Sequence, residues 1–501
     1  MDWTALAQQI VVTVYTIALA LVCLYGFHRY ALVYLYYRHR RKAPHPPGRF
    51  EDLPRVTIQL PMYNERFVAR RIIEQTCRID WPLDRLQIQV LDDSMDQTTE
   101  IASAAVARAA AGGFDIEYIH RDNRTGFKAG ALENGLRTAT GEFVTIFDAD
   151  FIPPPPFLRE CIDHFTDPAV CAVQTRWEHL NRDDSLLTRS QAIYLDGHFA
   201  IEHVARNRSG RFMAFNGTAG TWRKAAIADA GGWHHDTLTE DMDLSYRAQI
   251  RGWKFVFLSE QTTPAELPPE MSAFKAQQFR WTKGGAQTAI KMLPRILLSK
   301  VPLKAKVESF FHLTCFCVHA CVVVLASLLM PLLLIRHAQG GEYATWRMAA
   351  DMAVFSLGTI SASVFYVASQ YELFGDWRTV LKYLPFLMAL GVGVSLSNTK
   401  ALLEALFGKP SEFVRTPKYG QGRNRGDCDP ARRRKRDLLP WLEMLFGLYM
   451  AGSAAYCVVQ PAMLMAAPFL LIFAVGFFYV SILSFRSRAA RAAKPAPETT
   501  R

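Results

Sequence analysis

The amino-acid sequence predicts an α/β domain with a doubly wound, mostly parallel sheet, inserted in an α-helical transmembrane bundle. Of the 501 residues, 50% are hydrophobic, which is too many for an ordinary soluble protein of this length. The apolar residues are unevenly distributed: the stretch 10–37 is nearly free of charge, and similar runs recur only after residue 307. Between residues 51 and 300, short β-rich runs alternate with helix-length stretches, which is typical of a parallel sheet covered by helices.

The first apolar segment is predicted to be a membrane anchor and not a cleaved signal peptide. It lacks a basic start, and its apolar run is longer than that of a signal peptide. The basic residues Arg38, Arg40, Arg41 and Lys42 follow it, and such a cluster marks the cytoplasmic end of a span. We expect five regions, namely 1–50 (helix and basic linker), 51–300 (α/β domain), 301–407 (two spans and an interfacial helix), 408–437 (basic loop) and 438–501 (two spans and a basic tail).

Five segments are apolar over about 20 residues, which is long enough to cross a bilayer. They are 10–35, 308–335, 348–370, 438–459 and 462–484. A sixth apolar run is shorter and continues into polar residues, so we predict that 381–407 lies in or dips into the membrane interface. With five spans, every basic segment lies on the same side as the α/β domain. The expectation is a multi-pass protein of the cell (inner) membrane with a cytoplasmic α/β domain.

The net charge of +11 is concentrated beside the predicted spans. Residues 408–437 contain ten lysines and arginines against four acidic residues. Because these charges border membrane segments, they predict contact with membrane lipids and argue against nucleic acid as a partner. The nine cysteines show no regular loop spacing, which indicates a reducing compartment. Cys315, Cys317, His319 and Cys321 resemble metal ligands, but alternate helix positions point to different faces, so ordinary packing is favoured.

Strand-like runs are expected at 56–60, 88–91, 116–119 and 143–147. In doubly wound sheets, ligands bind at the carboxyl ends of the strands, and polar motifs follow three of these runs. Neither a Walker A sequence nor a Gly-x-Gly-x-x-Gly fingerprint is present. This argues against a P-loop or dinucleotide-binding enzyme.

Two pairs of aspartates follow predicted strands. Asp148 and Asp150 end the fourth run, and Asp92 and Asp93 end the second. Such carboxylates offer hard oxygen ligands to Mg²⁺ or Mn²⁺, which often completes its shell with substrate phosphates. Lys128 would add a positive charge for the same phosphates. The alternatives are a turn or capping role for the Asp148 pair and an ordinary solvated lysine.

Asp241 is the candidate general base. It lies in the run Thr239-Glu240-Asp241, and a carboxylate within hydrogen-bond reach can remove the proton of an attacking hydroxyl. The same run also fits the start of a helix, with Thr239 as the N-cap residue and acidic residues in the first turn. Both interpretations are compatible, because a helix would hold Asp241 rigidly.

A Gln-x-x-Arg-Trp motif occupies residues 277–281. Trp281 offers an apolar face of the kind on which sugars pack, and Gln277 and Arg280 can hydrogen-bond to a diphosphate or to an acceptor. Because a predicted span follows, the alternative is an interfacial Trp/Arg anchor.

These motifs together resemble the processive family 2 glycosyltransferases of the cellulose-synthase-like superfamily. The similarity is greatest to the plant cellulose-synthase-like A and C groups and their bacterial relatives, and it covers about residues 55–283. It rests on the ordered segments 58–65, 89–94, 121–124, 128–132, 146–151, 173–177, 215–220, 239–244 and 277–281.

The resemblance implies a GT-A fold, a nucleoside-diphosphate sugar donor, inversion at the anomeric carbon and a divalent metal, Mg²⁺ or Mn²⁺. The residues implied to bind the donor are Tyr63, Glu65, Asp92 or Asp93, Lys128, Asp148, Gln277 and Arg280. Those implied for the metal are Asp148 and Asp150, for the base Asp241, and for the acceptor Trp281, Thr239, Glu240, Asn216 and Gly217. A segment similar to the gating loop of cellulose synthase contains Phe413, Thr416 and Lys418, although Arg415 stands where that loop has an apolar residue.

The expected function is a polymerising β-glycosyltransferase that makes a β-linked glucan or mannan and passes it into the membrane bundle. UDP-glucose and GDP-mannose are both open as donors. The alternatives are a non-processive synthase that glycosylates diacylglycerol or ceramide, and a transporter with a degenerate transferase domain. We expect no C-terminal PilZ domain for a cyclic dinucleotide, because only a short tail follows the last predicted span.

Overall fold

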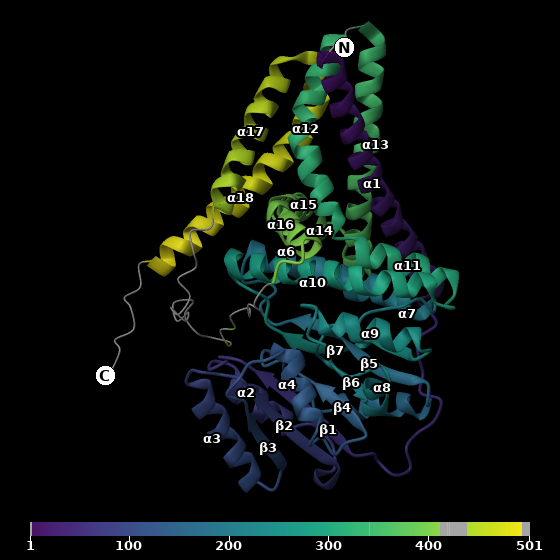
Figure 1. The fold of residues 1–501 in the computed structure, drawn as a ribbon, viewed down its shortest axis with the longest axis vertical. Coiled ribbons are helices and arrows are strands. Elements are labelled where there is room, and N and C mark those ends of the chain that lie inside the picture. Colours follow the sequence, from purple (N-terminus) through teal and green to yellow (C-terminus); the bar gives the residue numbers. More distant parts are fainter. Residues whose placement is uncertain (1–2, 340, 411–417, 419, 421–437, 493–501) are drawn as a thin grey trace.

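The computed structural model describes residues 3–339, 341–410, 418, 420 and 438–492. An α/β domain forms one half of the molecule and a bundle of long helices forms the other (Figure 1). The helix α1 (Trp3–His39) begins at the far end of the bundle and leads into the α/β domain. The predicted insertion of an α/β domain in a helical bundle is confirmed.

A seven-stranded sheet forms the centre of the α/β domain, in the order β3-β2-β1-β4-β6-β5-β7. All neighbouring pairs are parallel except those made by β6, which runs antiparallel to β4 and β5. The mostly parallel sheet is therefore confirmed, and the four predicted runs correspond to β1 to β4. The strands are β1 (Val56–Met62), β2 (Leu86–Asp92), β3 (Asp115–His120), β4 (Phe143–Ile146), β5 (Val170–His179), β6 (Gly220–Arg223) and β7 (Lys254–Ala265).

Helices cover both faces of the central strands, which explains why those strands are apolar. Ile58 packs with Ile72 of α2 in one core cluster, and Leu91 packs with Leu132 of α4 in another. The helices of the domain are α2 (Ala69–Thr76), α3 (Thr98–Ala111), α4 (Phe127–Leu136), α5 (Phe157–Cys161), α6 (Leu186–Asp196), α7 (Val204–Arg208), α8 (Lys224–Asp229) and α9 (Glu240–Ile250). Short turns are η1 (Leu83–Arg85), η2 (Ile162–Thr166) and the π-helix η3 (Gly197–His203).

Four helices of the described residues are long and apolar enough to cross a membrane. They are α1, α12 (Cys317–Gln339), α17 (Leu439–Val459) and α18 (Ala467–Ala492), the last preceded by the short η4 (Pro461–Ala466). The span expected at 308–335 begins at Cys317, because 303–314 forms the separate helix α11 (Leu303–Thr314). The segment expected at 348–370 lies within α13 (Gly341–Phe374), which is not among these four helices and runs beside α1 (Figure 1).

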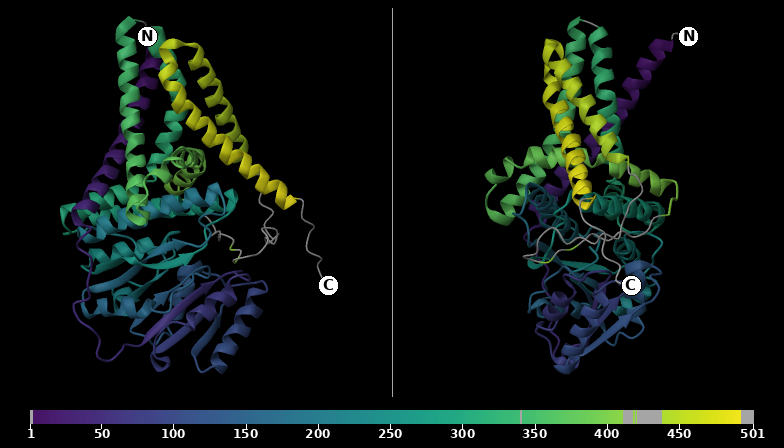
Figure 2. Two further views of the ribbon diagram at one scale, coloured as in Figure 1. Left: turned by 180° about the vertical axis from the view of Figure 1, so that it is seen from behind. Right: turned by 90° about the vertical axis from the view of Figure 1, so that its left-hand side faces the viewer.

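The segment 381–407 is broken into short helices at the foot of the bundle. α14 (Arg378–Leu381) is followed by α15 (Leu384–Gly393) and α16 (Ser395–Leu406), and the last two are bent by 41°. Figure 2 shows these helices lying across the junction between the bundle and the α/β domain. Such a bent pair fits either a broken span or a re-entrant segment.

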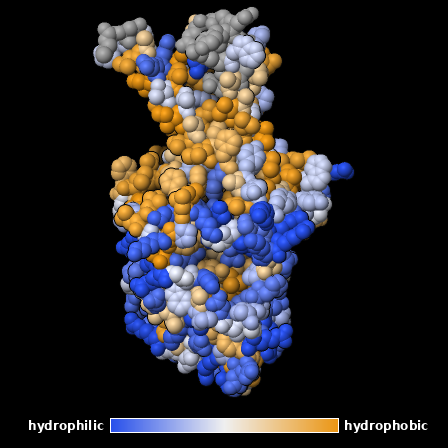
Figure 3. Space-filling model, turned by 90° about the vertical axis from the view of Figure 1, so that its right-hand side faces the viewer, coloured by the Kyte–Doolittle hydropathy of each residue, from blue (hydrophilic) through white to orange (hydrophobic). Residues whose placement is uncertain are grey.

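The long helix α10 (Met271–Leu298) lies between the sheet and the bundle (Figure 1). Lys275 of α10 forms a buried ion pair with Glu443 of α17 at 2.5 Å, and Lys283 pairs with Glu404 of α16 at 3.1 Å. Apolar side chains gather over the bundle and hydrophilic ones over the α/β domain (Figure 3). α10 therefore ties the hydrophilic domain to helices that associate with a membrane.

Candidate active site

A cavity of about 170 Å³ opens at the carboxyl ends of β1, β2 and β4. It brings together nearly all of the residues singled out in the sequence. Those lining it are Tyr63, Glu65, Asp93, Lys128, Asp148, Asp150, Asn216, Gly217, Thr239, Glu240, Asp241, Gln277, Arg280, Trp281 and Lys418. Asp92 does not line it, and Phe413 and Thr416 lie outside the described residues.

The two aspartates after β2 occupy different positions. Asp92 is fully buried and accepts hydrogen bonds from the Tyr118 hydroxyl at 2.7 Å and the Ser94 backbone N–H at 3.0 Å. Asp93 lines the cavity and accepts two hydrogen bonds from the Arg121 guanidinium, at 2.7 and 2.5 Å. Of this pair, only Asp93 is therefore placed to face a ligand.

Two ammonium groups contact the aspartates that follow β4. Lys128 Nζ lies 2.5 Å from Asp148 Oδ1, and Lys418 Nζ lies 2.5 Å from Asp150 Oδ2. Burial raises the pKa of Asp150, and Lys418 opposes that rise. Burial alone would lower the pKa of Lys128, but Asp148 and neighbouring acidic groups raise it above its usual value. The positive charge expected beside these carboxylates is thus present.

The residues after β4 fit a divalent metal. Asp148 and Asp150 are hard oxygen donors on one cavity, and each contacts a lysine through one of its two oxygens. The Asp148 side chain is 36% exposed, so it is accessible to an ion. In each carboxylate, the oxygen that does not contact a lysine is the ligand atom that a metal would use.

Asp241 lies in the first turn of α9, next to the loop that carries Gly217. Burial, followed by the neighbouring Glu240, raises the pKa of Asp241 to about 7, and Lys128 limits the rise. Gly217 has φ +78°, and a Cβ added to it would lie 3.0 Å from Asp241 Oδ2. Only a glycine lets the backbone approach the carboxylate this closely. The pKa near neutrality suits a general base.

The helix-capping interpretation of Thr239 is only partly correct. Thr239 is the N-cap residue of α9, but its side chain makes no capping hydrogen bond. Its hydroxyl lies instead 3.1 Å from that of Thr288 in α10. Asp241 Oδ1 accepts a hydrogen bond from the adjacent Met242 backbone N–H at 2.8 Å. The Asp241 carboxylate is thereby held in place while its other oxygen faces Gly217.

The Gln-x-x-Arg-Trp motif lies on α10, where helical spacing puts Gln277, Arg280 and Trp281 on one face. Burial lowers the pKa of Arg280, while Glu240, Asp148 and Asp241 counteract this. Trp281 packs partly against the core of the domain. Because these three side chains line the cavity, the motif belongs to the site and is no lipid-facing anchor.

Several cavity residues were not identified from the sequence. Trp177 and His179 come from β5, a strand outside the four predicted runs, although Trp177 belongs to the segment 173–177 that carries the family resemblance. Glu266 follows β7, pairs with Arg71 at 2.7 Å and lies close enough to Asp150 to raise its pKa. No sequence signal marked Glu266, because its position depends on the pairing of β5 with β7.

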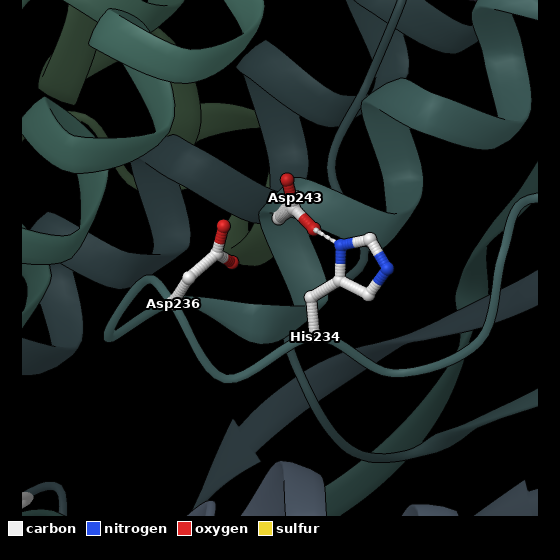
Figure 4. A group of neighbouring side chains, drawn as sticks. All are labelled: His234, Asp236 and Asp243. Carbon is white, nitrogen blue, oxygen red and sulfur yellow. Dashed lines mark ion pairs between the residues drawn. The ribbon is translucent and has the colours of Figure 1, made fainter.

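A second cluster of possible metal ligands contains His234, Asp236 and Asp243 (Figure 4). The ammonium of Lys291 lies 2.8 Å from Asp236, 2.9 Å from Asp243 and 3.1 Å from His234 Nδ1. Arg247 also pairs with Asp243 at 2.8 Å. Two cations thus balance the two carboxylates, and we interpret the cluster as an ion-pair network that joins α9 to α10.

The chain is similar to family 2 glycosyltransferases. The family model described as "Glycosyltransferase like family 2" matches residues 54–284. The chain is 39% identical over 430 residues to glucomannan 4-beta-mannosyltransferase 2 of Arabidopsis thaliana, covering 81% of this chain and 76% of that protein. It is 35% identical over 449 residues to glucomannan 4-beta-mannosyltransferase 7 of the same plant, covering 85% and 76%.

The fold is also similar to a solved mannosyltransferase from Pyrobaculum calidifontis in complex with GDP-Man and Mn²⁺. The TM-score is 0.54 with 21% identity, over 78% of this chain and 100% of that one. Together with the mixed sheet and the four apolar helices of the described residues, the family match identifies a membrane-associated glycosyltransferase of the GT-A fold. The chain belongs to glycosyltransferase family 2 and, within that family, to the cellulose-synthase-like enzymes.

Proposed function

We propose that this enzyme transfers a hexose from a nucleoside-diphosphate sugar to the end of a growing β-linked polysaccharide, with inversion at the anomeric carbon. The supporting observation is that Asp241, the Asp148–Lys128 pair and Trp281 line one cavity. GDP-mannose is the proposed donor and a β-1,4-linked mannan the proposed product. This choice rests on the similarity to glucomannan mannosyltransferases.

The proposed reaction needs one proton acceptor and a stabilised leaving group. Asp241 takes the proton of the acceptor hydroxyl as that oxygen bonds to the anomeric carbon of the donor. The bond from this carbon to the diphosphate oxygen breaks on the opposite face, and the nucleoside diphosphate leaves with the bonding electrons. Lys128 and Arg280 would stabilise the charge on that leaving group.

Asp148 and Asp150 are the residues that would hold Mg²⁺ or Mn²⁺. Bound there, the ion would supply further positive charge for the departing diphosphate. Tyr63, Glu65, Asp93 and Gln277 complete the proposed donor side of the cavity. Asn216, Gly217, Thr239, Glu240 and Trp281 form the proposed acceptor side.

The proposed setting is the cell (inner) membrane, with residues 51–300 in the cytoplasm. The four apolar helices support membrane association, and the basic segments at 38–42 and 408–437 support this orientation. Because α10 carries Trp281 and contacts α16 at the foot of the bundle, we propose that the polymer passes from Trp281 into the bundle.

The donor and product can be tested directly with purified protein. Incubation with GDP-mannose and Mn²⁺ is expected to release GDP and to yield β-linked polymer, whereas UDP-glucose should react more slowly. The products are sized by chromatography and digested with a β-mannanase. Formation of a single-sugar lipid, with no polymer from either donor, would favour the glycolipid synthase in place of the polymerase.

Replacing Trp281 by alanine is expected to abolish long polymer while sparing donor hydrolysis. Water needs no platform, but a sugar end must be oriented against an aromatic face before it can attack. Polymer length and free hexose are measured together. Trp281→Phe, which keeps an aromatic ring, is the matched control and should retain elongation. Equal loss of hydrolysis and elongation in Trp281→Ala would contradict a role confined to the acceptor.

A further inference from the structure

The side chain of Asn216 is held between two histidines of the π-helix η3. Asn216 Nδ2 lies 3.1 Å from His198 Nε2, and Asn216 Oδ1 lies 2.5 Å from His203 Nε2. The backbone N–H of Asn216 donates to Gln174 Oε1 at 3.1 Å. Isolated π-turns often occur at functional sites. The π-helix η3 supplies both hydrogen-bond partners of the Asn216 side-chain amide, which lines the cavity.

The chemistry of the neighbouring groups sets the direction of these hydrogen bonds. His198 Nδ1 lies 2.9 Å from the Glu202 carboxylate, which can only accept, so Nδ1 carries a proton. Burial lowers the pKa of His203 well below its usual value, so that ring is neutral. His203 Nδ1 is buried with no partner among the described residues, and an unpaired N–H is costlier there than an unpaired lone pair. The proton of His203 is therefore on Nε2.

It follows that His203 donates to Asn216 Oδ1 and that Asn216 Nδ2 donates to His198 Nε2. One of the two Asn216 amide protons is used in this way. Among the described residues, His198 is the one hydrogen-bond partner of Asn216 Nδ2. The second amide proton is left for a ligand in the cavity.

A buried chain of charges keeps this arrangement in place. Glu202 lies 3.3 Å from Arg206, and Arg206 lies 2.8 Å from Glu308 of α11. Glu308 in turn lies 3.1 Å from His28 of α1. Burial alone would raise the pKa of Glu202, but Arg206 and His198 hold it well below its usual value. Glu202 therefore stays charged and keeps the proton of His198 on Nδ1.

The position of Asn216 indicates what it would bind. The next residue, Gly217, accepts a hydrogen bond from Lys128 at 2.9 Å and lies against the Asp241 carboxylate. An attacking hydroxyl must lie within reach of Asp241, so the sugar that carries this hydroxyl would also come close to Asn216. A sugar hydroxyl oxygen accepts the kind of hydrogen bond that the free amide proton offers.

We infer that His198 and His203 are positioning residues that orient the Asn216 amide, so that its second N–H binds a hydroxyl oxygen of the acceptor sugar beside Asp241. This inference rests on the proposed transfer to a sugar acceptor. It adds two residues to the proposed acceptor side, namely the two histidines whose imidazoles fix the Asn216 amide.

The test uses His203→Leu and His203→Gln in the full-length enzyme, with a short β-1,4-manno-oligosaccharide as acceptor and as binding probe. His203→Leu is expected to raise the acceptor KM and the probe Kd about tenfold, which is the scale of one lost hydrogen bond. The donor KM and donor hydrolysis should not change. In His203→Gln the side-chain amide can donate to Asn216 Oδ1, so acceptor affinity should be rescued.

Asn216→Ala and the double variant separate positioning from a general structural effect. If His203 acts through Asn216, then His203→Leu adds no further loss of affinity in the Asn216→Ala background. His164→Leu, which changes another buried histidine outside this network, is the matched control. Full additivity, failure of His203→Gln to rescue, or an equal loss of donor hydrolysis would overturn the inference.

The outcome is distinct from that of the proposed function. A wild-type enzyme that elongates the oligosaccharide but shows additive effects at His203 and Asn216 would retain the function and lose the inference. A wild-type enzyme that neither binds nor elongates the oligosaccharide would overturn both the sugar-acceptor proposal and the inference built on it.

Discussion

Replacing Asp241 by asparagine is expected to lower turnover by at least ~10²-fold while nucleotide affinity stays close to that of the wild type. The amide keeps the size of the carboxylate but cannot accept a proton from an attacking hydroxyl. Turnover is measured as release of nucleoside diphosphate with acceptor present, and affinity by calorimetry with the nucleotide. Asp236→Asn is a matched control, because Asp236 lies close to Asp241 in the sequence but outside the cavity. Turnover of Asp241→Asn within a few-fold of the wild type would reduce Asp241 to a structural residue of α9.

The raised pKa of Asp241 gives the same hypothesis a pH signature. Burial and Glu240 raise the pKa to about 7, so the carboxyl is protonated below that value and ionised above it. A general base acts in its ionised form, so kcat/KM should reach its maximum above neutrality. It should fall about tenfold for each pH unit below about 7. Asp241→Asn should lack this inflection. A wild-type profile that is flat between pH 5 and 8 would contradict the assignment, since no essential group would then titrate there.

Removal of divalent metal is expected to lower activity at least ~10²-fold, because the departing diphosphate would lose a charge interaction of several kcal/mol. Activity should return on addition of Mn²⁺ or Mg²⁺ after EDTA is removed. The residues predicted to hold the ion are Asp148 and Asp150, and Asp150→Ala should have the same effect as EDTA. Calorimetry gives a readout independent of turnover: Mn²⁺ should tighten nucleotide binding to the wild type but not to Asp150→Ala.

The matched control for this experiment is Asp80→Ala, which removes an aspartate from an exposed ion pair with Arg159. Such surface pairs contribute little to stability, so this variant should behave as the wild type does. Full activity of the wild type in chelator would remove the metal from the mechanism. Metal-enhanced nucleotide binding by Asp150→Ala would instead show that other groups hold the ion.

Much of the donor side of the site could be predicted because it depends on local signals. The runs at 56–60, 88–91 and 143–147 are short and apolar, and each is followed at once by polar residues. In a parallel sheet these residues must meet at one edge, whatever the remaining strands do. Asp93 and the Asp148 pair are therefore in the cavity as expected. Helical spacing similarly puts Gln277, Arg280 and Trp281 on one face of α10.

The positions that were missed depend on contacts between distant segments. Asp92 and Asp93 both follow the second run in the sequence, but in the structure Asp92 is buried and bonded to the Tyr118 hydroxyl, whereas Asp93 lines the cavity. Glu266 enters the site because β7 pairs with β5 across more than eighty residues of chain, a register that no local pattern encodes. The span α12 begins only at Cys317, because the preceding residues form the separate helix α11, which lies against α10.

The sequence by itself determined the family, the order of membrane and α/β segments, and the chemical types of the residues in the cavity. These follow from apolar run length, strand rhythm and ordered motifs, all of which are local properties. The tertiary structure alone decided which polar groups meet: Lys128 with Asp148, Lys418 with Asp150, and the histidines of η3 with Asn216. Side chains on separate elements come within hydrogen-bond distance only through the packing of the whole domain. The pKa of Asp241 is raised for the same reason, because its burial and its neighbours are supplied by that packing.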